Sequence, residues 1–256
     1  MRVLTDAFLR AKNVFYAKGP IGFLRAMFRY GAILLSGLCW ILGSWILRPS
    51  FQLQNQRYRY FLHLYNLTWR SERAVEIPIV RKLMEGYDEG DILEVGNVLS
   101  HYFRVQHDIV DKYEKNHGVL NQDAATFSPK HLYKLIVCIS TLEHVGWDEY
   151  PRDPSKTVAA FENLLDCLSA DGKMIVTVPV GQNPELDRLI AYGVIQFDQR
   201  YYMKRTSKLN SWVEADLDEV GRHANRFSPT YLMLGIKLKE RSEHTRDIHK
   251  ALGLTP

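Results

Sequence analysis

The sequence predicts an α/β fold with a doubly wound, mostly parallel sheet that ends in antiparallel strands and is preceded by a helical hydrophobic segment. Three observations predict this class. Short apolar runs alternate with helical patterns between residues 92 and 178, which is typical of parallel strands covered on both faces. Apolar residues recur at every second position in 232–238, as in a further strand. An uncharged stretch, residues 30–47, lies near the N-terminus.

The composition fits one main domain with an extension, because 256 residues lie close to the upper size of a single core. Hydrophobic residues make up 46% of the chain, which is too many for a disordered protein. The cysteines Cys39, Cys138 and Cys167 are odd in number and far apart. This spacing excludes a disulfide scaffold and a C-x-x-C metal or redox site, and it indicates a reducing compartment.

The formal net charge of +4 is an average over two different segments. Residues 1–60 hold nine Lys or Arg against one acidic residue, Asp6, for a net charge of +8, and the rest of the chain has a net charge of −4. We therefore divide the chain into a basic, apolar, membrane-associating helical segment at 1–60 and an α/β domain at 61–256.

The uncharged stretch 30–47 has the length of a membrane helix. At a rise of about 1.5 Å per residue it spans about 27 Å, close to the ~30 Å thickness of the hydrocarbon core. Arginines alternate with apolar residues just upstream, which favours a helix lying on an anionic surface. We expect residues 18–48 to contact a membrane. A buried hydrophobic helix and a cleaved signal peptide are the alternatives.

Basic residues flank this stretch on both sides. The positive-inside rule keeps its N-terminal side in the cytoplasm, but Arg48, Arg57 and Arg59 on the other side also resist translocation. A re-entrant or monotopic insertion leaves both flanks in the cytoplasm. We therefore expect a membrane-associated protein whose α/β domain faces the cytoplasm, with crossing and dipping of residues 30–47 both left open.

The elements of the α/β domain follow in order. Residues 52–85 have a helical pattern, in which Pro78 is tolerated only near a helix start or at a kink. The apolar runs predict strands at Ile92–Val95, Asp108–Val110, Gly118–Asn121, Leu135–Ser140 and Met174–Val178. Apolar residues at i, i+3 and i+4 predict a helix at about Pro154–Leu168. Two further strands are expected at Tyr201–Lys204 and Tyr231–Lys239.

Candidate site residues lie at the ends of the predicted strands, because ligands of open α/β sheets bind beyond the carboxyl ends of the strands. The candidates are Glu94, Gly96, Asn97, Asp111, Asp123, Ser140, Glu143 and His144. Gly96 allows the backbone to approach a ligand closely. Asp111 follows the second strand and is suited to accept from two ribose hydroxyls, and Asp123 follows the third and can accept from an adenine amino group. Both aspartates can also be plain turn residues.

Five segments in this order resemble the motif set of class I S-adenosylmethionine-dependent methyltransferases. They are ILEVGN, HDIVDKYE, NQDAATF, YKLIVCISTLEHVGW and LSADGKMIVTVPVG, and together they cover roughly residues 90–182. The resemblance implies a Rossmann-like seven-stranded sheet with an antiparallel last strand, S-adenosylmethionine as cofactor and methyltransferase activity. It also implies that Glu94 and Gly96 border the methionine end of the cofactor, Asp111 the ribose and Asp123 the adenine.

The first loop departs from the family pattern, since Val98 and Ser100 stand where later glycines are usual. Glu114 is therefore a second candidate for the ribose, and a non-catalytic scaffold with the same fold is an alternative function. A nicotinamide or nucleotide-sugar enzyme is disfavoured, because no G-x-G-x-x-G follows the first strand.

His144, next to Glu143, is a candidate general base, because an ordinary imidazole pKa near 6.5 suits proton transfer at neutral pH. It can equally cap a helix or pack on Trp147. No third residue at metal-ligand spacing accompanies the pair, so no metal is expected. The basic residues accompany the apolar stretch rather than the acidic domain, which argues against a nucleic-acid partner. A small-molecule or lipid-linked, or polysaccharide-related, methyl acceptor is the expected partner.

Overall fold

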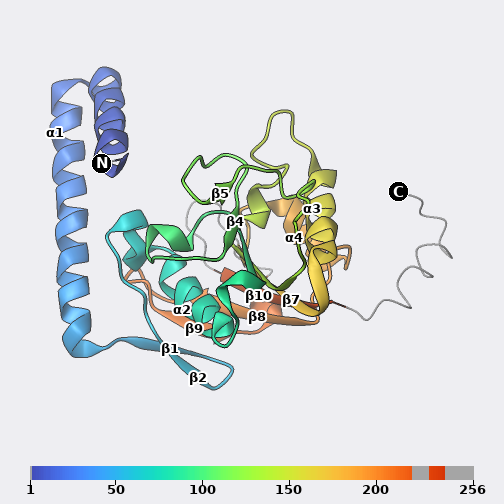
Figure 1. The fold of residues 1–256 in the computed structure, drawn as a ribbon. Coiled ribbons are helices and arrows are strands. Elements are labelled where there is room, and N and C mark those ends of the chain that lie inside the picture. The colour runs from blue at the N-terminus through green and yellow to red at the C-terminus, as the bar shows by residue number, and fades with distance from the viewer. Residues whose placement is uncertain (1, 221–230, 240–256) are drawn as a thin grey trace.

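The computed structural model describes residues 2–220 and 231–239, and its centre is an eight-stranded sheet (Figure 1). The strands are β3 (Ile92–Val95), β4 (Asp108–Val110), β5 (Val119–Leu120), β6 (Tyr133–Ile139), β7 (Leu168–Pro179), β8 (Gln199–Arg205), β9 (Trp212–Ala215) and β10 (Tyr231–Leu238). Their spatial order is β5-β4-β3-β6-β7-β10-β8-β9. Strands β3 to β7 are parallel to one another, whereas β10 is antiparallel to both of its neighbours.

The predicted Rossmann-like sheet with an antiparallel last strand is confirmed. All seven predicted strands are present, and β10 is the reversed one. An eighth strand, β9, pairs with β8 at the edge of the sheet. The chain reverses direction between β8 and β9, in a turn where Asn210 has a φ of 64°. Because of this turn, the residues that begin at Trp212 pair with β8 and extend the sheet.

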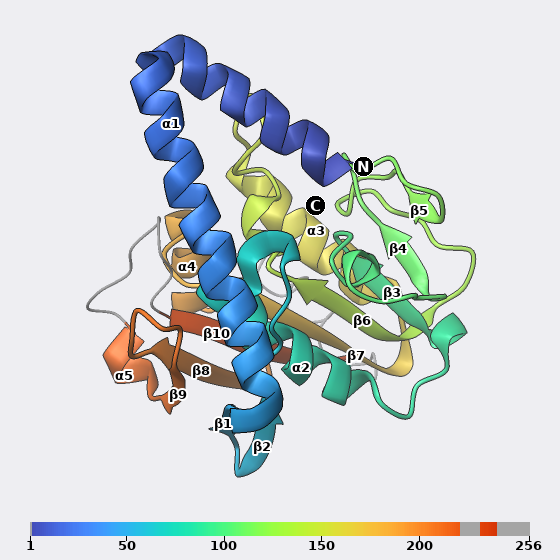
Figure 2. The same cartoon turned by 90° about the vertical axis from the view of Figure 1, so that its left-hand side faces the viewer.

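Helices cover both faces of the sheet, which explains why the central strands are continuously apolar. The helix α2 (Arg73–Met84) covers one face (Figure 2). Its Val75 and Ile79 are buried in the core on that side. The helices α3 (Pro154–Asp166) and α4 (Pro184–Ala191) pack on the other face. The short helix α5 (Leu217–Val220) follows β9. The 3-10 turns are η1 (Tyr65–Arg70), η2 (Glu89–Asp91), η3 (Leu99–His101) and η4 (Leu142–His144).

The predicted helix over 52–85 is wrong in its first part. Residues 50–59 form a hairpin of β1 (Ser50–Leu53) and β2 (Gln56–Arg59). Its two turn residues, Gln54 and Asn55, have positive φ angles of 48° and 62°. This is the conformation of a type I′ turn, whose twist matches that of the two strands it joins. Phe51 and Leu53 alternate with exposed neighbours and join the core beside α2, so the segment has the two-residue period of a strand.

Pro78 lies inside α2 rather than near its start, and the surrounding chain compensates for it. A proline has no N–H to give to the carbonyl four residues earlier, here that of Ala74. The N–H of Phe61 donates to this carbonyl at 2.9 Å. The segment leading into η1 therefore satisfies the helical group that Pro78 leaves open.

The helix α1 (Arg2–Leu47) has two parts that meet at Gly19, whose φ of 66° and ψ of −178° are not helical (Figure 1). Its second part, Gly19–Leu47, is long and apolar enough to cross a membrane, by length and composition alone. Only 6% of its most apolar window is buried, and Phe28 and Ile46 are 81% and 84% exposed. The helix is therefore not packed as a core helix of the α/β domain.

Candidate functional site

A cavity of about 440 Å³ opens beyond the carboxyl ends of β3, β4, β5 and β6. Five of the eight predicted residues line it, namely Gly96, Asn97, Asp111, Asp123 and His144. The alternative candidate Glu114 lines it as well. The other three, Glu94, Ser140 and Glu143, are buried and lie outside the lining. The sheet edge thus brings together most of the predicted site, as expected for an open parallel sheet.

Gly96 is required by the close approach of two loops. Its φ is 81°, a conformation that residues with a side chain rarely adopt. A Cβ atom built on Gly96 would collide with the side chain of Thr141, which follows β6. The N–H of Gly96 donates to the carbonyl of Val110 at 2.8 Å. The loop after β3 is therefore held between the ends of β4 and β6, with its backbone facing the cavity.

Glu94 is buried in the interior and holds the loop after β3 through hydrogen bonds instead of facing the cavity. Its Oε1 accepts from the N–H groups of Val98 and Leu99, each at 2.7 Å. Its Oε2 is bonded to Nε2 of His107 at 2.7 Å, and Nδ1 of His107 lies 3.1 Å from Glu89. Burial alone would lower the pKa of His107, but the hydrogen bonds and charges of Glu94 and Glu89 raise it above the ordinary value.

Asp111 is largely occupied by backbone groups. Its Oδ1 accepts from the N–H groups of Tyr113 and Glu114, each at 2.8 Å. Its Oδ2 accepts from the N–H of Asn97 at 3.1 Å. A carboxylate has about four acceptor positions, so Asp111 keeps about one, on Oδ2. The residue shapes the turn after β4 and ties it to the loop after β3.

Glu114 keeps more of its acceptor capacity than Asp111. Its Oε2 is 3.2 Å from Nε2 of His101, and its Oε1 accepts from Nδ2 of Asn116 at 2.5 Å. About one acceptor position is left on each oxygen. This two-oxygen geometry suits a pair of adjacent hydroxyl groups.

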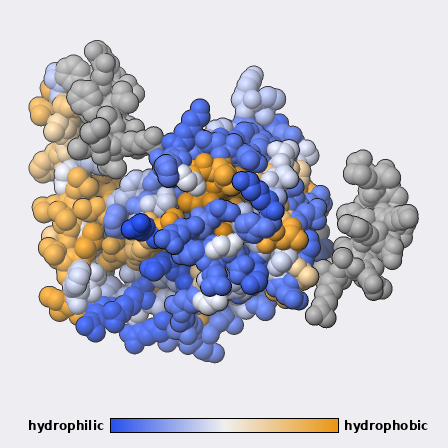
Figure 3. Space-filling model, viewed as in Figure 1, coloured by the Kyte–Doolittle hydropathy of each residue, from blue (hydrophilic) through white to orange (hydrophobic). Residues whose placement is uncertain are grey.

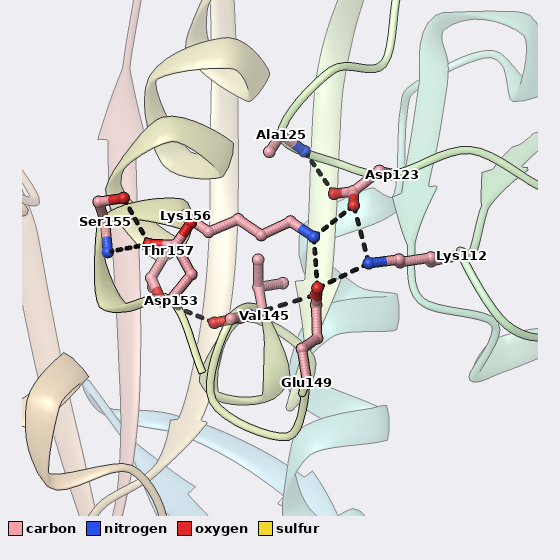
Figure 4. A network of polar contacts seen from close by, with 10 residues as sticks. Lys112, Asp123, Ala125, Val145, Glu149, Asp153, Ser155, Lys156 and Thr157 are labelled. Carbon is pink, nitrogen blue, oxygen red and sulfur yellow. Dashed lines mark hydrogen bonds and ion pairs between the residues drawn. The ribbon is translucent and has the colours of Figure 1, made fainter. Parts of the chain in front are cut away.

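Asp123 belongs to a ring of four charged side chains at the rim of the cavity (Figure 4). Its Oδ2 lies 3.0 Å from Lys112 Nζ and 2.5 Å from Lys156 Nζ. The same two lysines lie 2.7 Å and 2.5 Å from Oε2 of Glu149. The Oδ1 of Asp123 accepts from the N–H of Ala125 at 3.1 Å. The ring joins the segments after β4, β5 and η4 to α3.

The charges of the ring stabilise one another. Partial burial raises the pKa values of Asp123 and Glu149, but hydrogen bonds from the lysines lower both below their ordinary values. The pKa of Lys112 is raised, first by its hydrogen bond to Glu149. Lys112, Lys156 and Glu149 are not among the site residues predicted from the sequence. Their pairing depends on loops after β4, β5 and η4 meeting helix α3 in space, and no local sequence pattern indicates this.

His144 is half-exposed and lines the cavity. Its Nδ1 is 2.6 Å from Oδ2 of Asp148, four residues further along the chain. Its Nε2 is 3.8 Å from Oε1 of Glu143. A carboxylate at Nδ1 favours the tautomer that carries its proton there, so Nε2 is left with a lone pair, as a general base requires.

Glu143 and Ser140 are parts of the protein interior. Glu143 is 1% exposed, and neither of its oxygens has a hydrogen-bond partner within the described part of the chain. Burial raises its pKa well above the ordinary value, which favours the neutral acid. Ser140 donates its hydroxyl proton to the buried Glu76, which lies 3.1 Å from Arg73. In the described residues, no group of three or more His, Cys, Asp or Glu side chains is arranged to hold a metal ion.

Comparisons with known proteins concern the fold. No family model matches the sequence, and no curated protein sequence matches it. The structure is similar to that of the N-methyltransferase NodS from Bradyrhizobium japonicum WM9 with S-adenosyl-l-homocysteine, at 13% identity over 65% of this chain and 86% of that one, with a TM-score of 0.43.

Two further solved structures have a comparable likeness. A SAM-dependent methyltransferase from Thermotoga maritima is 12% identical over 63% of this chain and 87% of that one, with a TM-score of 0.40. An rRNA methylase from Streptococcus thermophilus is 14% identical over 63% of this chain and 96% of that one, with a TM-score of 0.37. The strand order, with the parallel strands β3 to β7 followed by the reversed strand β10 between β7 and β8, defines a Rossmann-like fold.

Proposed function

We propose that the protein is an S-adenosylmethionine-dependent methyltransferase that holds its cofactor in the 440 Å³ cavity. One observation carries the proposal. The cavity is lined by Gly96, Asn97, Asp111 and Asp123, which follow β3, β4 and β5 in the order of the methyltransferase motifs. A volume of this size lies within the ~300–1,000 Å³ that is usual for pockets that bind cofactors and other small ligands.

The cavity residues suit the polar groups of this cofactor. Nδ2 of Asn97 is a buried donor with no hydrogen-bond partner among the described residues, and a carboxylate at the methionine end would satisfy it. Glu114 has one open acceptor position on each oxygen, so it takes the two ribose hydroxyls, while Asp111 positions the turn and accepts one hydrogen bond at most. Asp123 has one open position left for an adenine amino group.

In this reaction the main contribution of the protein is to position the methyl acceptor relative to the cofactor. The cofactor supplies an electrophilic methyl group, and a nucleophile in line with it gains most of its rate from orientation. His144 takes the proton of the acceptor at Nε2, and Asp148 holds the ring and stabilises the imidazolium that forms. Glu143 is not the base in this scheme, because its carboxyl group is buried beside the cavity and favours its neutral form.

We further propose that residues 18–48 associate with an anionic membrane surface and that the α/β domain faces the cytoplasm. The support is the exposed apolar surface of Gly19–Leu47 together with its arginine flanks. An enzyme held at a membrane meets membrane-bound molecules in two dimensions. Its acceptor is therefore a small molecule or a lipid-linked, polysaccharide-related molecule rather than nucleic acid.

Calorimetric titration of the full chain in detergent tests the assignment. S-adenosylmethionine and its demethylated product should each bind saturably with one molecule per chain. NAD, which also carries an adenosine group, should give no heat and serves as the control. No heat and no thermal shift with either adenosyl ligand, in protein with a cooperative unfolding transition, would contradict the proposal.

A further inference from the structure

A second cavity, of about 300 Å³, lies where α1 meets the α/β domain. Its walls are mostly aromatic or apolar, and three of the five tryptophans of the chain contribute to it. The lining residues are Trp40, Pro49, Ser50, Tyr60, Leu62, Trp69, Leu209, Asn210, Ser211 and Trp212. None of them lines the first cavity, so the two sites are separate.

The walls of this cavity are held by specific contacts. A Cβ atom on Gly37 would overlap the ring of Trp69, so the glycine lets η1 pack directly on α1. Trp40, one turn further along the helix, is thereby placed at the cavity. On the opposite side, the indole N–H of Trp212 donates to Oδ1 of Asn210 at 2.8 Å, and its backbone N–H donates to the hydroxyl of Tyr60 at 2.7 Å.

The outer surface of α1 beside the cavity is apolar and exposed. Leu42, Trp45 and Ile46 are 67%, 79% and 84% exposed. Figure 3 shows a continuous hydrophobic band along the second part of α1, whereas the surface of the α/β domain in the same view is mostly hydrophilic. An apolar surface of this extent usually marks an interaction site for a membrane or another protein.

Basic side chains lie at the same junction. Arg48, Arg57 and Arg59 are exposed, and they belong to the end of α1 and to the hairpin that follows it. Nε of Arg57 donates to the hydroxyl of Ser50 at 2.7 Å, and Ser50 is part of the cavity wall. A guanidinium group is therefore fixed beside an aromatic cavity, which matches a ligand with an anionic head and an apolar tail.

A buried polar group in the wall has no partner. Nε1 of Trp69 makes no hydrogen bond to any described residue, although Trp69 is only 4% exposed. An unpaired buried donor costs free energy, and a ligand oxygen such as an ester carbonyl would remove that cost. This observation points to an occupant that is mainly apolar but carries an acceptor.

We propose that this cavity binds one acyl chain of an anionic phospholipid, with the phosphate at Arg57 and an ester oxygen at Trp69. The exposed apolar helix, the arginine beside the cavity and the unpaired indole N–H each match one part of such a lipid. The site would fasten the junction of α1 and the α/β domain to a bilayer. It goes beyond the proposed methyl transfer, and its test does not measure methyl transfer.

The test uses brominated phospholipids, which quench tryptophan fluorescence on contact. The full chain with Trp40→Phe, Trp45→Phe and Trp147→Phe keeps only Trp69 and Trp212, both in the cavity wall. Vesicles of phosphatidylglycerol with dibrominated chains should quench this emission strongly. Brominated phosphatidylcholine vesicles should quench it less. Arg57→Ala should lower the affinity for the anionic vesicles about fivefold, as expected for one basic residue at a membrane surface.

The experiment includes a matched control and a second tryptophan variant of the same chain. Arg104→Ala removes the same charge from an exposed position elsewhere, and it should leave the quenching unchanged. A variant of the full chain in which Trp45 is the only tryptophan reports whether the outer face of α1 contacts the bilayer. Quenching of Trp45 without quenching of Trp69 and Trp212 overturns the proposal. Equal quenching by both lipids overturns it too, and so does burial of the cavity by a second copy of the chain, detected as concentration-dependent dimerisation in light scattering.

Discussion

Glu94 and His107 are joined by a 2.7 Å hydrogen bond in the interior, and neither residue lines the cavity at the strand ends. The other oxygen of Glu94 holds the N–H groups of Val98 and Leu99. The pair thus connects the start of β4 to the loop that follows β3. Glu94 therefore positions the loop after β3, and Gly96, Asn97 and Val98 of that loop line the cavity.

His107 should make stability depend on pH. Its pKa is raised in the folded protein, so the protonated form contributes stability that is complete below the unfolded value of about 6.5 and is lost as pH rises through the folded value. We expect the free energy of unfolding, measured by urea titration from pH 6 to pH 9, to fall over this window. His107→Gln should remove the dependence, whereas the exposed His117→Gln should retain it. An unchanged pH dependence in His107→Gln would assign the effect to another group.

Glu114→Gln should weaken binding of S-adenosylmethionine more than Asp111→Asn does. The glutamate has an open acceptor position on each oxygen, and hydrogen bonds to charged groups contribute about 1.5–3 kcal/mol each, so a loss of tenfold or more is expected. Asp111→Asn should instead lower the melting temperature, because it disturbs three backbone hydrogen bonds. Calorimetry and thermal unfolding measure the two effects. The opposite ranking of affinities would identify Asp111 as the ribose ligand.

Gly96→Ala should destabilise the protein by about 1–3 kcal/mol from backbone strain alone, with the clash against Thr141 adding to it. Gly90→Ala is the matched control, because its Cβ would meet no atom within 4 Å and its φ is not positive. Urea unfolding of both variants measures the difference. Equal stability of the two variants would mean that the loop after β3 does not adopt this conformation.

Lys156→Met should weaken the charged ring. The pKa values of Asp123 and Glu149 are lowered in the folded state, so their contribution is present above the unfolded values near 4 and is lost as pH falls through the lower folded values. The free energy of unfolding of the variant should be about 1 kcal/mol lower at neutral pH, since the ring is partly exposed and screened. As the pH is lowered into the acid range, the stability of the variant should also fall less than that of the unaltered chain. Lys130→Met, at an exposed position, is the control for the loss of a lysine. A ring variant that unfolds like the control at every pH would show that these ion pairs contribute nothing.

The full chain should sediment with membranes after cell lysis and should be released by detergent. High salt alone should release little of it, because the apolar surface of α1 remains buried in lipid. Arg25→Glu with Arg29→Glu should shift part of the protein to the supernatant by repelling anionic lipid. Recovery of the unaltered chain in the supernatant without detergent would contradict membrane association.

The strands and the site differ in how far the sequence determines them. The parallel strands β3, β4 and β6 were predicted closely, because a strand buried on both faces must be continuously apolar. The hairpin at 50–59 was misread as helix, since its few apolar residues fit either period and its turn contains no glycine. The reversed strand β10 was predicted from its two-residue period.

The site was predictable as far as its position along the strands. Residues directly after a strand fall at the same edge of the sheet, which is why Gly96, Asp111 and Asp123 lie together. Whether a side chain at that edge turns toward the cavity or into the interior depends on its neighbours. Ser140 turns inward because Glu76 of α2 accepts its hydroxyl proton, and that contact joins segments 64 residues apart in sequence.

The contact between Gly37 and Trp69 limits how α1 can sit in a bilayer. Gly37 lies near the middle of residues 30–47, about 15 Å from the end of the helix at a rise of about 1.5 Å per residue. A bilayer that enclosed the whole stretch would also have to enclose η1, with its polar backbone and the arginine that ends it. While this contact holds, one side of the helix is shielded by protein and the other is free to meet lipid. If α1 binds a bilayer with this contact intact, we therefore expect the helix to lie along the membrane surface with its free side toward the lipid, and not to cross the bilayer.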